Sequence, residues 1–86
     1  MPEISRFFGI IIAMFYSDHA PPHFHVRYAD RKALVGIETL AVLEESLPPR
    51  VLGLVVEWAA LHRRDLLDDW ELARRQAPLK GIDPLE

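Results

Sequence analysis

The feature that most constrains the fold is the apolar run Phe7–Tyr16, which is ten residues long. An α-helix needs about 20 consecutive apolar residues to cross a membrane, so this run is too short to do so and a membrane is excluded as a partner. The run is rich in Ile and Phe, which favour β-strands. Both alternating sides of such a strand would be apolar, and strands of that kind are usually covered on both faces. We therefore predict one buried strand over residues 7–16.

Length and composition indicate one folded unit. The chain has 86 residues, of which 50% are apolar and 27% are charged. A chain of this length has room for one hydrophobic core and is too short for the large catalytic barrels. We predict a single domain over 1–86, with a β-meander over 1–47, a helical part over 48–77 and a C-terminal tail over 78–86.

The first half of the chain has the pattern of an antiparallel sheet. After a proline-containing loop over 17–22, residues 23–28 alternate apolar and polar side chains, as a half-buried strand does. A four-residue turn over 29–32 would lead into a third strand over 33–39. Residues 40–47 hold either a short fourth strand or an irregular connection. These segments predict a three- or four-stranded, mainly antiparallel meander.

The predicted turn fixes a register for this hairpin. It places His23 opposite Glu38 and His25 opposite Gly36. In this register the apolar side chains collect on one face, whereas a slip of one residue would mix the two faces. The polar face is then expected to carry histidines, Arg27 and a carboxylate.

The second half has helical periodicity. Pro48 and Pro49 suit a helix start, and Ser46 is a nearby capping candidate. Apolar or small residues recur every three or four positions up to residue 77. One helix over 49–77 would be about 42 Å long, so a break near Arg63 is favoured, with Asp65 capping the second helix. The predicted class is α+β, with one long or two shorter C-terminal helices after the meander.

A histidine cluster is the strongest chemical signal. Three of the four histidines lie within seven residues, between positions 19 and 25. His23 and His25 share one strand face, and a carboxylate beside them would complete a site for a divalent transition metal such as Zn, Mn or Ni. The candidate metal ligands are His23, His25, Glu38, Asp18 and His19.

The same residues support two other interpretations. Without a metal, His23 and His25 could act as acid and base while Arg27 holds an anion or phosphate, as in a small hydrolase or nuclease. Alternatively, histidines on a sheet face are simply solvated or hydrogen-bonded for packing. The sequence leaves these alternatives open, and whether the chain is an enzyme stays undecided.

Charge and cysteine content limit the classes of partner and the cell compartment that the sequence favours. With 10 Lys+Arg against 13 Asp+Glu, the formal net charge is −3. Nucleic acid is therefore not favoured as a partner, although local contact through the basic pairs on the helical part stays open. The absence of Cys excludes a disulfide framework and agrees with a cytoplasmic location.

The expected helices can cover one face of the sheet, so the tail or another protein chain is expected to cover the other. That expectation predicts a homo-oligomer or a bound partner protein. The two tryptophans on the apolar helical face are either core anchors or contact residues. The candidate interface residues are Trp58, Trp70, Leu79, Ile82 and Leu85.

Several segments resemble one bacterial family. They are residues 1–10 (MPEISRFFGI), 18–26 (DHAPPHFHV), 47–50 (LPPR), the 57–63 segment and the closing prolines at 78 and 84. The chain resembles the family called domain of unknown function 4160, over nearly its whole length. The resemblance implies no established activity. It does imply a neighbour-encoded small partner protein, in an arrangement similar to a two-gene toxin–antitoxin module, with this chain as a protein-binding member.

Overall fold

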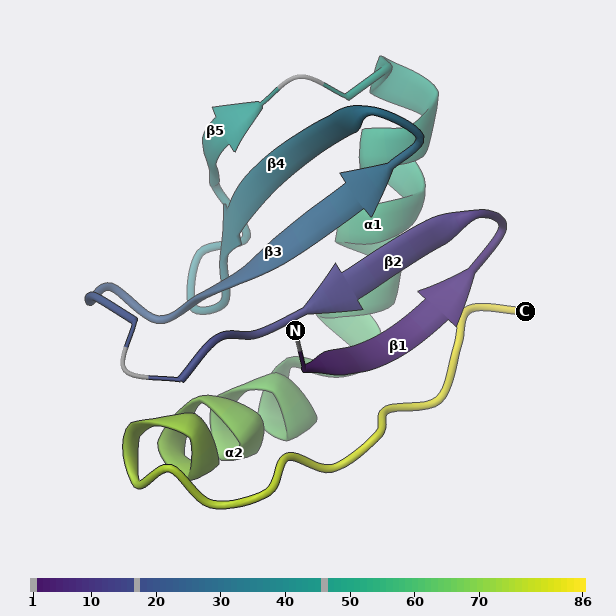
Figure 1. Ribbon diagram of the computed structural model, residues 1–86. Coiled ribbons are helices and arrows are strands. Elements are labelled where there is room, and N and C mark those ends of the chain that lie inside the picture. The colour runs from purple at the N-terminus through teal and green to yellow at the C-terminus, as the bar shows by residue number, and fades with distance from the viewer. Residues whose placement is uncertain (1, 17, 46) are drawn as a thin grey trace.

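The computed structural model describes residues 2–16, 18–45 and 47–86. Five strands come first and two helices follow, which confirms the α+β class and adds a strand to the predicted meander. The elements are β1 (Glu3–Phe7), β2 (Ile10–Ala13), β3 (His23–Tyr28), β4 (Arg31–Gly36), β5 (Val42–Glu45), α1 (Pro49–Leu61) and α2 (Arg63–Arg74). The strands form one antiparallel sheet in chain order (Figure 1).

The prediction of a single strand over 7–16 was wrong, because a tight hairpin turn divides it. Phe8 and Gly9 connect β1 to β2, with φ angles of 50° and 78°. Positive φ at both central residues is the geometry that tight hairpins require. Phe8 is consequently 62% exposed although it stands in an apolar run.

The β3–β4 turn is also shorter than predicted. Tyr28 pairs with Arg31 across a two-residue turn, so His23 lies opposite Gly36 and His25 opposite Leu34. The predicted pairing of His23 with Glu38 and of His25 with Gly36 was therefore wrong by two residues. Because a shift of two residues keeps every side chain on its own face, the predicted polar and apolar faces survive the error.

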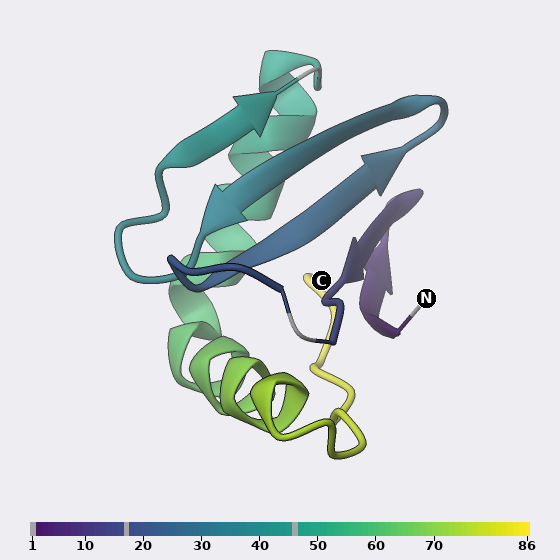
Figure 2. The same cartoon turned by 60° about the vertical axis from the view of Figure 1, so that its left-hand side comes forward.

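The helical part consists of two helices that meet at His62. Pro48 is the N-cap of α1, which confirms the proline start, while Ser46 lies outside the described residues. His62, and not Asp65, is the N-cap of α2, so the break falls just before the predicted position. Asp65 lies in the first turn of α2, where an acidic side chain interacts favourably with the helix dipole. Figures 1 and 2 show α1 across one face of the sheet and α2 near one end of it.

The core lies between this inner face of the sheet and the two helices. Trp58 of α1 is fully buried, and its ring lies 5.4 Å from that of Phe7 and 5.9 Å from that of Phe24 between centroids. Trp70 of α2 is also buried. Both tryptophans are thus core anchors.

The C-terminal tail is hydrogen-bonded to three elements in succession. The backbone N–H of Lys80 donates to Asp69 Oδ1 of α2 at 2.9 Å. The N–H of Ile82 donates to the carbonyl of Ile4 in β1 at 2.7 Å. The indole N–H of Trp58 in α1 donates to the carbonyl of Asp83 at 2.8 Å. We call these three contacts the tail junction.

The tail junction bears on the residues predicted to contact other chains. Trp58, Trp70 and Ile82 are buried, and Leu79 and Leu85 pack partly buried against the same core. All five side chains contribute to the core of the chain itself, and their contact with another chain stays a prediction.

The outer face of the sheet, opposite α1, contains an open hollow of about 560 Å³. We call it the outer hollow. Its lining comes from residues between positions 11 and 34, and no tail residue contributes. Among its lining residues are Ile11, Phe15, His25, Arg27, Lys32 and Leu34.

Neither helix in the described part of the chain has the length and apolar character of a membrane span.

Candidate metal centre

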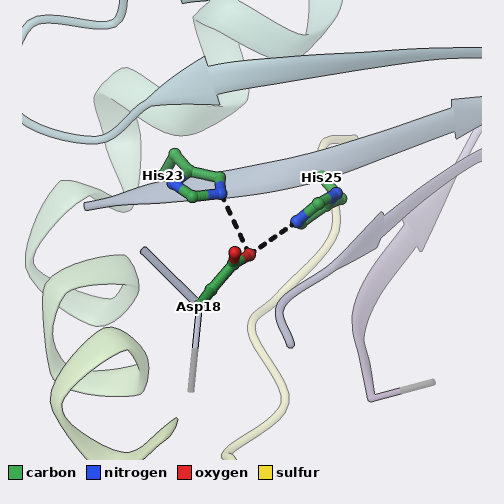
Figure 3. A group of neighbouring side chains, drawn as sticks. All are labelled: Asp18, His23 and His25. Carbon is green, nitrogen blue, oxygen red and sulfur yellow. Dashed lines mark hydrogen bonds and ion pairs between the residues drawn. The ribbon is translucent and has the colours of Figure 1, made fainter. Parts of the chain in front are cut away.

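Three side chains from the loop before β3 and from β3 itself point toward one another (Figure 3). One of them, His25, lines the outer hollow. One potential ligand atom each from Asp18, His23 and His25 lies within 4.8 Å of the others. Oδ2 of Asp18 is 3.0 Å from Nε2 of His23 and 2.8 Å from Nε2 of His25. These three residues could hold a metal ion, and we call this candidate site the metal centre. Strand alternation places both imidazoles on one face, and the loop brings the carboxylate over them.

His23 is fixed at the base of the metal centre. Its Nδ1 is 2.8 Å from the carbonyl oxygen of Pro21. A carbonyl can only accept, so Nδ1 carries the hydrogen. The ring is buried and packs against Trp70, with centroids 5.3 Å apart. A histidine that donates one ring N–H to a backbone carbonyl, and so leaves its other nitrogen able to bind an ion, has the usual supporting contact of a metal ligand.

His25 forms the solvent side of the group. Its side chain is 30% exposed, and its ring stands edge-to-face with Phe15 at 4.3 Å. One ligand is therefore rigidly buried while another is accessible, so an ion or a substrate could enter from the outer hollow.

The carboxylate of Asp18 is held in its charged form. Burial alone raises the pKa of Asp18, but hydrogen bonds from His25 and from the backbone N–H of His19 lower it, and the charges of His23 and His25 lower it further. The net result is a pKa below the usual value for aspartate. The group therefore presents a negative ligand oxygen at neutral pH.

The tautomer of His23 creates a demand for positive charge. With the hydrogen on Nδ1, a neutral His23 directs the lone pair of Nε2 at Oδ2 of Asp18, only 3.0 Å away. Two lone pairs at that separation repel each other. A metal ion held by these side chains would supply positive charge that relieves the repulsion.

The structure brings together only some of the predicted ligands. His23, His25 and Asp18 meet, whereas Glu38 is exposed beyond the end of β4 and outside the group. Glu38 was predicted through the register that proved wrong by two residues. His19 contributes its backbone N–H to Asp18 at 3.0 Å, but its exposed side chain does not join the group.

Arg27 and several supporting residues surround the metal centre. Arg27 lies two residues after His25, on the same face of β3. Its side chain is exposed and lines the outer hollow. The sequence did not predict the roles of the Pro21 carbonyl or of the packing partners Phe15 and Trp70. The adjacent prolines were a signal of a rigid loop, but nothing in the sequence placed α2 against His23.

A scan of protein families matches residues 9–71 to the family described as Domain of unknown function (DUF4160). The chain belongs to this family. The DUF4160 match spans the metal centre and Arg27, whereas the tail lies outside it. No curated protein and no solved structure matches the chain significantly. The DUF4160 family carries no activity in its description, so function has to be argued from the site itself.

Proposed function

We propose that the protein holds one divalent transition-metal ion through Asp18, His23 and His25 and serves as a small metal-dependent hydrolase. The observation that supports this most is the geometry of His23, whose Nδ1–H is bound by Pro21 while Nε2 faces the carboxylate. Two imidazoles and one carboxylate suit Zn, Mn or Ni and leave coordination positions open. An ion bound there would supply a Lewis acid that makes a coordinated water more acidic.

Each of the three side chains would have a different role in the site. Buried His23 sets the position of the site, because its ring is held at Nδ1 and against Trp70. Asp18 offsets the charge of a cation, and the lowered pKa of its carboxyl keeps that negative charge available. His25 lies at the mouth, next to the hollow where a substrate would have to lie.

A metal-free hydrolase is the alternative chemistry. In that case a second proton on a histidine takes the place of the ion, Asp18 orients His25, and His25 acts as acid or base. The two versions differ in one measurable property, which is binding of the ion itself.

Calorimetric titration of EDTA-treated protein with Zn²⁺, Mn²⁺ and Ni²⁺ tests the proposal. We expect about one ion per chain, with binding abolished by His23→Ala together with His25→Ala. His19→Ala is the matched control, since it removes an exposed histidine from the same loop and should bind like the wild type. Absence of binding in the wild type, or binding that survives the double substitution, would leave only the metal-free alternative. Circular dichroism checks that each variant is folded.

A second proposal concerns the role in the cell. Among the described residues no helix covers the outer face (Figure 1), and its hollow includes the half-buried apolar side chains Ile11, Phe15 and Leu34. We propose that a neighbour-encoded partner protein, as in a cytoplasmic toxin–antitoxin-like pair, or a second copy of this chain binds this face and excludes other ligands from the hollow. Co-expression with the neighbouring gene product, followed by affinity capture and light scattering, tests it. A monomer that captures nothing from that pair would reject this role.

A further inference from the structure

We infer that the outer hollow binds the phosphodiester backbone of a single-stranded nucleic acid, with Arg27 gripping the phosphate next to the metal centre. The inference names a substrate class for the proposed hydrolase and rests on that proposed function. Three features of the outer face support it: the spacing along β3, the charge of the hollow, and its aromatic lining.

Spacing provides the geometric argument. His23, His25 and Arg27 occupy alternate positions of β3 and therefore project on the same face. Successive positions on one strand face are roughly 6.5–7 Å apart. Successive phosphates of an extended nucleic-acid strand have a similar spacing. A phosphate at the metal centre would thus place its neighbour beside Arg27.

The charge of the hollow differs from that of the whole chain. Its lining includes the cations Arg27, Arg31 and Lys32 and one acidic residue, Asp30. The formal charge of these described side chains is 3 − 1 = +2, whereas the whole chain carries −3. Arg31 and Lys32 already interact with other residues of the chain, so anion binding depends on Arg27. The acidic residues of α2 do not line the hollow.

Arg27 is the cation best placed to bind an external anion. Its side chain is exposed and makes no ion pair or side-chain hydrogen bond in the described part of the chain. A guanidinium binds a phosphate through two parallel N–H donors, which fixes the orientation of the phosphate as well as its position.

Aromatic and apolar side chains beside the cations suit bases. Phe15 lines the hollow next to His25, with the two rings 4.3 Å apart between centroids. Stacking on aromatic rings combined with a cationic track is how proteins bind single strands without reading their sequence. Because the hollow is open, it suits an extended nucleic-acid strand that lies across it better than a small molecule that has to be enclosed.

The reaction would be hydrolysis of one phosphodiester. An oxygen of water forms a bond to phosphorus, and one P–O ester bond breaks. One proton of the water is released, and the departing oxygen takes up a proton. The products are a phosphomonoester and an alcohol, and no oxidant or reductant is needed.

The binding test uses fluorescence anisotropy at low salt with 5′-labelled single-stranded RNA and DNA 12-mers of one sequence. We expect Arg27→Gln to weaken binding at least about 5-fold and to reduce the slope of log K against log salt by about 1. Arg50→Gln, which removes an exposed arginine of α1 outside the hollow, should bind like the wild type. If neither 12-mer binds, or if both variants weaken binding equally, the inference is overturned.

Cleavage of the same 12-mers in the presence of Mn²⁺ identifies the source of the phosphodiester. Cleavage of RNA alone, of DNA alone or of both supports the inference and names the substrate, whereas intact 12-mers overturn it. Metal titration of Arg27→Gln separates the two proposals, because this variant should bind metal like the wild type. If the wild type binds metal but not nucleic acid, only the nucleic-acid inference is refuted. If the wild type binds no metal, the proposed metal-dependent function is refuted.

Discussion

Two aspartates in this small protein have opposite environments. Asp18, in the metal centre, receives hydrogen bonds from His25 and a backbone N–H, and its pKa is lowered. Asp69, in the tail junction, is fully buried. Its Oδ1 accepts the N–H of Lys80, while its Oδ2 has no hydrogen-bond partner among the described residues.

The pKa of Asp69 is shifted in the other direction. Burial raises it most, the hydrogen bond and the charge of Lys80 oppose the rise, and the nearby carboxylates of Asp65 and Asp68 add to it. A carboxylate among imidazoles stays charged and is available to a ligand, whereas a carboxyl sealed under the tail serves as a clamp. The groups that surround an aspartate therefore decide whether it is available to bind a ligand or holds the fold together.

The largest expected effect is on metal affinity. Asp18→Asn keeps the size of the side chain but removes the negative ligand oxygen, so Zn²⁺ affinity should fall at least about 100-fold. Asp69→Asn is the matched control and should leave the affinity unchanged. Calorimetry on both variants checks this, and an Asp18→Asn variant that still binds tightly would contradict the assignment.

The next effect is on stability. Asp69→Ala removes the acceptor of the Lys80 N–H inside the protein, which should lower the free energy of unfolding by about 1–3 kcal/mol. Metal affinity should not change. Asp68→Ala is the matched control, because Asp68 is exposed and makes only a 3.6 Å ion pair with Lys80; its effect should stay below about 1 kcal/mol. Urea denaturation of both variants tests whether the clamp depends on Asp69.

A smaller effect is expected at the other end of the tail junction. Trp58→Phe keeps an aromatic ring in the core but loses the N–H donated to Asp83. We expect a loss of about 1 kcal/mol in the free energy of unfolding. Hydrogen exchange at the amide of Ile82 should become faster, because Ile82 directly precedes Asp83, whose carbonyl accepts the indole N–H of Trp58. Unchanged exchange there would show that the tail is fixed without the indole.

The smallest effect concerns pH. The raised pKa of Asp69 means that the folded state binds a proton more tightly than the unfolded state above the ordinary value of 3.8. Its contribution to stability therefore falls as pH rises through the raised pKa. The lowered pKa of Asp18 has the opposite sign, so its contribution is present above the ordinary value and is lost as pH falls through the lowered pKa.

Urea denaturation between pH 3 and 7, in EDTA, checks both signs. Relative to the wild type, Asp69→Asn should gain stability as pH rises, and Asp18→Asn should lose it. Parallel curves for the wild type and both variants would refute the contrast between the two aspartates.

Local patterns predicted much of the fold. Alternation over residues 23–28 identified β3 and placed His23 and His25 on one face, and Pro48 marked the start of α1. The turn between β1 and β2 was missed, and the turn between β3 and β4 was predicted as four residues instead of two, because each turn begins with a residue that is not a typical turn former. Phe8 and Ala29 both adopt positive φ, where Gly or Asn is the usual choice.

The candidate site was predictable to the extent that it is local. Its two histidines follow from strand spacing, and Asp18 lies only seven residues from His25 in the sequence. Glu38 was misplaced because its position depended on the length of a turn. The tail junction could not be predicted, because it joins residues 80–83 to elements distant in the sequence, and no periodicity encodes such a contact.

The tail junction also determines when folding can finish during synthesis. The five strands can assemble as they leave the ribosome, since each pairs with a neighbour in the chain. The carbonyl of Ile4 and the indole of Trp58 receive their tail partners only after residue 83 has emerged. The hydrogen bonds that attach β1 and α1 to the tail are therefore among the last contacts to form.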